Sequence, residues 1–218
     1  MTQGTLTAPS LADEQRELAQ TRILRAAGAA LAARGLAATV DDVAEAAGIS
    51  RRTVFRHFTT RDALFVAVIR AGVRRYAEQI PAPPDGDDLR GWLVELLEVT
   101  HRLNARNGRV FWDLVGVQAA DLSRDLAMAA AECRDSRNRF ATTVAELMWR
   151  ARGGHGQPPR WLVDAVAVQL SGFTTQSLAG DLGRAPDEVA HVSAQVIEAA
   201  LASALAQSAE SSPGSAFS

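Results

Sequence analysis

Apolar residues recur at every third or fourth position along almost the whole chain of 218 residues. This spacing places them on one face of an α-helix, and no stretch alternates apolar and polar residues for long enough to form a useful strand. The pattern therefore predicts an all-α fold. The predicted helices span about 11–34, 40–47, 50–58, 60–79, 88–104, 107–118, 121–152, 159–179 and 186–207.

Proline and glycine divide the chain into two helical regions. The stretch PAPPDGDD, residues 81–88, breaks the helical pattern and marks a boundary between them. We predict a small N-terminal domain over 11–60 and a larger helical domain over 61–208. The first helix of the larger domain, 60–79, is expected to link the two.

Residues 40–58 have the pattern of a helix-turn-helix. In the first short helix, the small residue Ala44 allows a second helix to approach closely. Gly48 suits a turn with positive φ, and Ser50 can cap the next helix, in which Val54 faces inward. With the helix over 11–34, these elements predict a three-helix domain.

The second helix of this motif gathers positive charge on its outer face. No acidic residue occurs from Ala46 to Arg61, and at about 100° per residue Arg52 and Arg56 lie nearly opposite Val54. A helix that enters the major groove of DNA needs outward side chains of this kind, and arginine is well suited to guanine. An ordinary solvated helix is the alternative, and the absence of acidic residues disfavours it. Thr53 and Phe55 flank the outer face, with Arg51 and His57 lower on its sides.

The charge balance of the whole chain agrees with a polyanionic partner for the N-terminal third. Residues 1–80 hold 11 arginines and 8 acidic residues, whereas residues 81–218 hold 12 arginines and 17 acidic residues. This asymmetry alone is a weak signal. Together with the helix-turn-helix pattern, it favours double-stranded DNA as the partner.

The sequence TRILRAAGAALAARGLAATVDDVAEAAGISRRTVFRHFTTRDAL, residues 21–64, resembles the N-terminal DNA-binding domain of the TetR family of bacterial transcriptional regulators. The resemblance implies that Arg52 and Arg56 face the bases. Phe55 stands where the family often has tyrosine, so a hydroxyl contact to phosphate is missing. Its ring is expected either to stack against the sugar-phosphate wall or to support Arg56. The residues that the resemblance makes phosphate-facing are Thr39, Ser50, Arg51, Thr53, His57 and Arg61.

The resemblance also implies that residues 88–208 bind an effector and form a homodimer. The apolar stripes of 159–179 and 186–207 suit a dimer interface, although a monomer that buries them internally is the alternative. A two-fold dimer would select a palindromic operator. The expected function is thus that of a repressor that a small ligand releases from such an operator.

A ligand pocket is expected among the segments 88–118, 121–152 and 159–179. Most large apolar residues at helical spacing belong to a core, so the polar residues His101 and Gln169 are the more informative candidates. Their surroundings favour an apolar or aromatic small molecule. The candidate lining residues are Trp92, His101, Phe111, Trp112, Phe140, Met148, Trp149, Gln169 and Phe173.

Composition and motifs exclude several other classes. The 47% of apolar and 22% of charged residues are ordinary for a globular protein, with disorder expected only at 1–10 and 209–218. The single Cys133 excludes an internal disulfide and fits a reducing compartment. No signal peptide and no apolar run near the ~20 residues of a membrane span is seen. We therefore expect a cytoplasmic protein.

No sequence pattern for catalysis, a cofactor or a metal is present. The chain lacks the GxxxxGK, HExxH and GxSxG motifs, and its acidic pairs lie at helix starts, where capping explains them. We therefore do not expect an enzyme. The alternatives that stay open are an all-α enzyme whose helix-turn-helix serves only for packing, and a DNA-binding protein without a ligand.

Overall fold

The computed structural model describes residues 10–84, 88–115 and 122–211, with only the backbone of 107–115. Every regular element within these ranges is a helix, which confirms the all-α prediction. Short 3₁₀ and π-helical segments, Gly35–Ala37 and Gln176–Asp181, join some of them. The α-helices are α1 Leu11–Arg34, α2 Val40–Ala47, α3 Arg51–His57, α4 Arg61–Gln79, α5 Leu89–Val115, α6 Arg124–Ala151, α7 Arg160–Gln169, α8 Gly172–Thr175 and α9 Pro186–Ser211.

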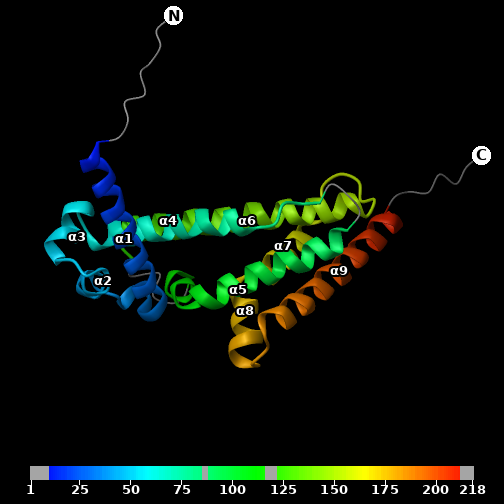
Figure 1. The fold of residues 1–218 in the computed structure, drawn as a ribbon. Coiled ribbons are helices and arrows are strands. Elements are labelled where there is room, and N and C mark those ends of the chain that lie inside the picture. Colours follow the sequence, from blue (N-terminus) through cyan, green and yellow to red (C-terminus); the bar gives the residue numbers. More distant parts are fainter. Residues whose placement is uncertain (1–9, 85–87, 116–121, 212–218) are drawn as a thin grey trace, which may run out of the picture.

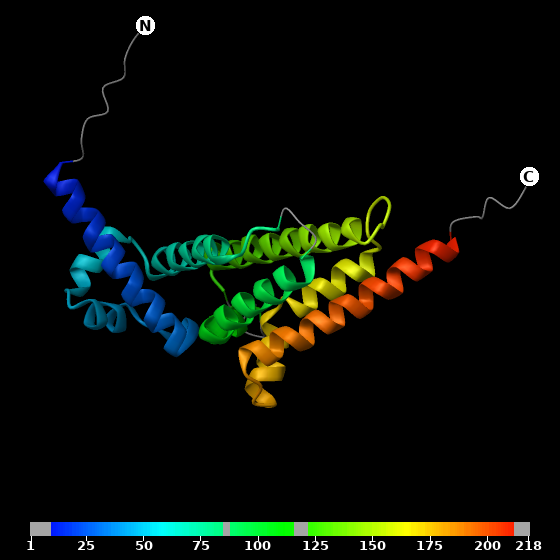
Figure 2. The ribbon, with the colours of Figure 1, turned by 45° about the vertical axis from the view of Figure 1, so that its right-hand side comes forward.

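The helices form a small head at one end of an elongated body (Figure 1). We call α1 to α3 the head and α5 to α9 the body. α4 leads from the head into the body, where it packs against α6. The turned view shows α9 along one outer side of the body, where it packs on α5 and α7 (Figure 2).

Two hydrophobic cores hold these parts together. The first core joins the head to α4 and to the start of α6, and Ile23, Leu31 and Phe65 are buried within it. Burying each such side chain contributes about 1.5–3 kcal/mol. The second core fills the body between α5, α6, α7 and α9. The head is therefore packed against the body through a shared core and not through a loose linker.

Two predicted helix boundaries in the body are wrong. The segments predicted as 88–104 and 107–118 form one continuous helix, α5, up to Val115. The polar residue Asn104 does not end this helix, because its side-chain amide instead donates to the carbonyl of Leu170, 3.4 Å away. The predicted helix 159–179 is broken, because Ser171 is extended and its hydroxyl accepts from the backbone N–H of Thr174 to cap α8.

The last helix is longer than the sequence indicates. α9 continues to Ser211, so residues 209–211, which we assigned to a disordered tail, form its last turn. By length and composition alone, α9 would also qualify as a membrane span. Its apolar residues Val189, Ile197 and Leu201 are buried inside the protein, as in the core helix of a globular body.

Candidate DNA-binding surface and ligand site

The helix-turn-helix begins with a reciprocal cap on α2. The hydroxyl and the backbone N–H of Thr39 both donate to the carboxylate of Asp42, each over 2.8 Å, while the backbone N–H of Asp42 donates to the Thr39 hydroxyl. The bond from the Thr39 backbone, and to a smaller extent the bond from its hydroxyl, hold the pKa of Asp42 below its usual range. The capping box fixes where α2 starts.

The turn between α2 and α3 depends on Gly48. Its φ of 62° and ψ of 39° are left-handed, and the next N–H, that of Ile49, donates to the carbonyl of Ala44 over 3.0 Å. The Ser50 hydroxyl then caps α3 by accepting from the backbone N–H of Thr53 at 3.1 Å. The two hydroxyls of Ser50 and Thr53 are themselves 2.9 Å apart, which orients both side chains.

Arg52 and Arg56 form the outward face of α3. Val54, on the opposite side, is 1% exposed, whereas both arginines are exposed. Neither arginine makes a hydrogen bond or an ion pair with any other residue that the structure describes. Together with Thr53 they line a surface hollow of about 270 Å³. Two unpaired guanidinium groups are thus available to an external acceptor.

The flanks of α3 are partly engaged within the protein. Arg51 donates to the carboxylate of Asp41 over 2.7 Å, and its guanidinium lies 5.4 Å from the ring centre of Phe55. Both partners of the ion pair are more than half exposed, so the pair is worth little and can exchange for a phosphate. The ring of Phe55 remains 36% exposed beside it.

His57 is turned partly inward. Its Nε2 atom is buried and has no hydrogen-bond partner among the described residues. Burial lowers the pKa of His57, and the positive charges of Arg56 and Arg16 lower it further. The ring is therefore neutral at physiological pH and does not add positive charge to the surface.

Arg61, the first residue of α4, holds the connection between α1 and α2. Its Nε donates to the carbonyl of Ala38 at 3.0 Å, and its Nη2 donates to the carbonyl of Leu36. The third nitrogen, Nη1, pairs with Asp62 at 3.2 Å, and the whole group lies 4.5 Å over the ring of Phe65. The sequence predicted a phosphate contact here, whereas the structure gives each of the three guanidinium nitrogens one internal partner.

In the body, His101 is the centre of a buried polar cluster. Its ring nitrogens lie 2.8 Å from the hydroxyl of Thr175 and 3.1 Å from that of Ser193, so the ring links α5 to α8 and α9. The Asn104 amide also donates to Thr175, at 3.3 Å. His101 is fully buried, and burial lowers its pKa from 6.5 to about 4. The ring is therefore neutral, with one nitrogen donating and the other accepting.

The other ligand candidates differ in their burial and in their partners. Trp149 and Met148 are buried in the body core, and Trp149 donates to the carbonyl of His155 at 3.3 Å. Trp92 is buried in the same core, where its indole donates to the carbonyl of Pro81 over 3.0 Å. Phe140 is half-buried with its ring edge against Tyr76, Gln169 is half-buried, and Phe173 is 47% exposed. The side chains of Phe111 and Trp112 lie outside the described residues.

Sequence reasoning did not identify the partners that fix these side chains. Asp41, Thr175 and Ser193 lie between 10 and 92 positions from the residues that they contact. Periodicity alone carries no signal for such pairs. Among the described residues, no three histidine, cysteine or acidic side chains gather into a metal site.

Known proteins share both the head sequence and the fold. Residues 23–68 match the family model described as bacterial regulatory proteins, tetR family. The chain is 27% identical over 143 residues to the HTH-type transcriptional repressor SCO4008 of Streptomyces coelicolor, covering 62% of this chain and 73% of that protein.

Two solved structures illustrate the likeness of fold. A tetR-family transcriptional regulator from Streptomyces coelicolor aligns with a TM-score of 0.62 at 20% identity, over 90% of this chain and 82% of that one. FadR from Bacillus subtilis, solved in complex with stearoyl-CoA, aligns with a TM-score of 0.58 at 13% identity, over 83% and 97%. Residues 23–68 therefore match the tetR family of bacterial regulatory proteins, and the chain shares its fold with a transcriptional regulator of that family.

Proposed function

We propose that this protein is a cytoplasmic repressor that binds a palindromic operator through α3 and is released by a small organic ligand. The observation that carries the proposal is the pair of exposed, unpaired arginines, Arg52 and Arg56, on the face opposite the buried Val54. Such side chains can donate two hydrogen bonds each to guanine in the major groove, each pair worth about 1–3 kcal/mol of discrimination. The similarity of the chain to the transcriptional repressor SCO4008 supports repression of transcription as the effect of operator binding.

The backbone of the operator is proposed to meet the flanks of α3. Their hydroxyl groups, the exchangeable Arg51 and the Phe55 ring suit contacts to phosphate and sugar, which position the helix without reading sequence. His57 and Arg61 are directed inward, so we assign them to the support of this surface. The proposed backbone-contacting residues are Thr39, Ser50, Arg51, Thr53 and Phe55.

A homodimer is proposed through the outer face of α9 with α7 and α8. Val192 and Val196, one turn apart on α9, are 42% and 41% exposed, and Val168 of α7 is 56% exposed. Leu201, which lies in the apolar stripe 186–207 predicted for the interface, is 2% exposed and belongs to the body core. The unpaired apolar surface therefore supports an interface around Val192 and Val196, with two-fold symmetry matched by the operator.

The effector is proposed to bind in the body near the His101 cluster. This cluster is a set of buried polar groups in apolar surroundings, joining α5 to α8 and α9, so a ligand that exchanges one of its bonds would shift these helices. FadR, which shares the fold, binds stearoyl-CoA, which supports a ligand-responsive body. The proposed ligand contacts remain His101, Phe111, Trp112, Phe140, Trp149, Gln169 and Phe173.

Selection of bound duplexes from a random DNA pool, followed by transcription in vitro, tests the proposal. We expect one palindromic sequence to be enriched, and transcription from a promoter that contains it to fall when the protein is added. No enrichment would contradict sequence-specific binding. A rise in transcription would contradict repression while leaving the DNA-binding surface intact.

A further inference from the structure

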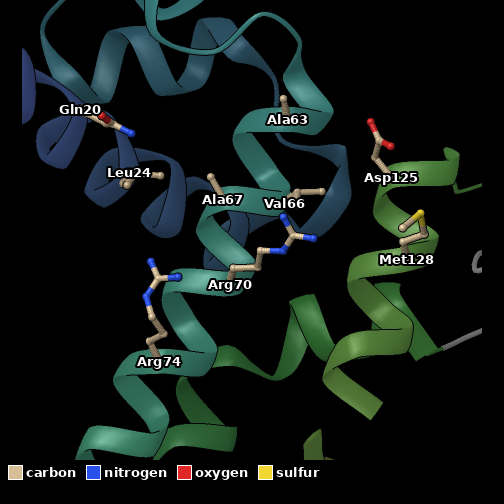
Figure 3. A pocket seen from close by; sticks show the side chains of 9 residues that line it. All are labelled: Gln20, Leu24, Ala63, Val66, Ala67, Arg70, Arg74, Asp125 and Met128. Atoms are coloured by element: carbon tan, nitrogen blue, oxygen red, sulfur yellow. The ribbon is translucent and has the colours of Figure 1, made fainter. Parts of the chain in front are cut away.

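A groove of about 450 Å³ lies where helices of the head and the body meet at α4. Figure 3 shows α4 as the floor, α1 as one wall and α6 as the other. Its volume is in the range of small-molecule sites, which is about 300–1,000 Å³. None of its lining residues belongs to the ligand candidates of the body, so the groove is a separate place in the fold.

The middle of the groove is apolar. Leu24 on α1 and Ala67 on α4 are partly exposed there, and Val66 adjoins them. Met128 on α6 is 52% exposed at the far side. An exposed thioether is flexible and polarizable, so it can adapt to an apolar molecule. Covering this surface would remove apolar area from water, which is favourable.

Two arginines of α4, one turn apart, give the groove its charge. Arg70 is already paired, because it donates to both carboxylate oxygens of Glu132 at 2.9 and 2.8 Å. Arg74 makes no hydrogen bond or ion pair with any residue in the described part of the chain. Figure 3 shows Arg70 directed toward the α6 side and Arg74 toward the α1 side, away from Asp125. The positive charge of Arg74 therefore lies beside the apolar middle of the groove and away from the carboxylate of Asp125 on α6.

We propose that this groove binds an amphipathic organic anion of small size. The carboxylate pairs with Arg74, and the apolar ring covers Leu24 and Ala67 toward Met128. Such a molecule contacts both α1 of the head and α4, the helix that leads from the head into the body. If the proposed function holds, its binding also changes operator affinity, because it favours one arrangement of head and body.

Calorimetric titration of the full-length protein with 2-naphthoate, in the absence of DNA, tests the site directly. The neutral 2-naphthol and the cation 2-naphthylmethylammonium have the same ring and serve as matched probes. We expect 2-naphthoate to bind at least about tenfold more tightly than either, as one added charge-assisted contact provides. Equal affinities for all three probes, or no saturable binding of 2-naphthoate, would overturn the proposal.

Three variants locate the binding. Arg74→Gln is expected to weaken 2-naphthoate about tenfold and to leave 2-naphthol unchanged, whereas Arg75→Gln, on the next position of α4 and outside the groove, changes neither. Ala67→Phe fills the floor and is expected to abolish binding of both probes, with circular dichroism checking the fold. Retention of 2-naphthoate by Arg74→Gln or by folded Ala67→Phe would place the site elsewhere. Because no DNA is present, these results are independent of whether the operator proposal holds.

Discussion

Replacement of Arg61 by Gln distinguishes two possible roles of this residue. It is either an internal clamp, which holds the segment between α1 and α2 in place, or a contact to a DNA phosphate. The guanidinium donates to the carbonyls of Leu36 and Ala38 and covers the ring of Phe65. The side chain is 36% exposed, so we take about 1 kcal/mol for each of the two hydrogen bonds. The ring contact adds about 0.5–1 kcal/mol. The expected loss is therefore ~2–3 kcal/mol in the free energy of unfolding.

Urea denaturation measures this loss, and operator affinity at several salt concentrations measures the role in DNA binding. A phosphate contact would contribute about 0.9 to the slope of log affinity against log salt, and an internal clamp contributes almost nothing. We expect an unchanged slope with reduced stability. Arg56→Gln is the matched control, because Arg56 is unpaired and its loss should change stability by less than about 0.5 kcal/mol. A slope reduced by ~0.9 with unchanged stability would refute the clamp.

Four further predictions concern the body and α4. The unfolded chain protonates His101 near pH 6.5 and the folded chain only near 4, so the free energy of unfolding should fall by ~3 kcal/mol as the pH drops between these values. Titration of stability against pH checks this, and a His101→Gln variant that kept the whole dependence would contradict it. Calorimetric melting should show Gly72→Ala more stable by about 0.5–1 kcal/mol, since nothing lies near the added methyl in α4. By contrast, Gly154→Ala should be less stable, because its Cβ would lie 2.3 Å from a buried indole ring; an unaltered melting temperature would refute that packing. Val192→Glu with Val196→Glu should give folded monomers by sedimentation, and a persistent dimer would place the interface elsewhere.

The head was predictable because its structure is set by near neighbours in sequence. Thr39 and Asp42 are three residues apart, as are Ser50 and Thr53, and their caps define α2 and α3. The turn at Gly48 requires a left-handed residue, which the sequence shows directly. Periodicity and capping signals therefore predicted these helices to within one residue.

The body was less predictable because distant contacts decide its details. The sequence predicted a helix that ends at 104, yet Asn104 donates a hydrogen bond to Thr175, 71 positions away, and α5 continues. Arg61 looked like a surface cation, yet carbonyls 23 and 25 positions earlier hold it inside. The ion pair between Arg70 and Glu132 spans 62 positions. Such partners become visible only when the helices are packed together.

The most direct test of the central claim compares operator DNA with a scrambled duplex of equal length at one salt concentration. We predict that the wild-type protein binds the selected operator at least about a thousandfold more tightly. Arg52→Ala should lose ~1–3 kcal/mol on the operator and relax the preference at particular base pairs, with a much smaller effect on the scrambled duplex. Equal binding of both duplexes by the wild type, or an equal loss on both in Arg52→Ala, would contradict base reading by the outer face of α3.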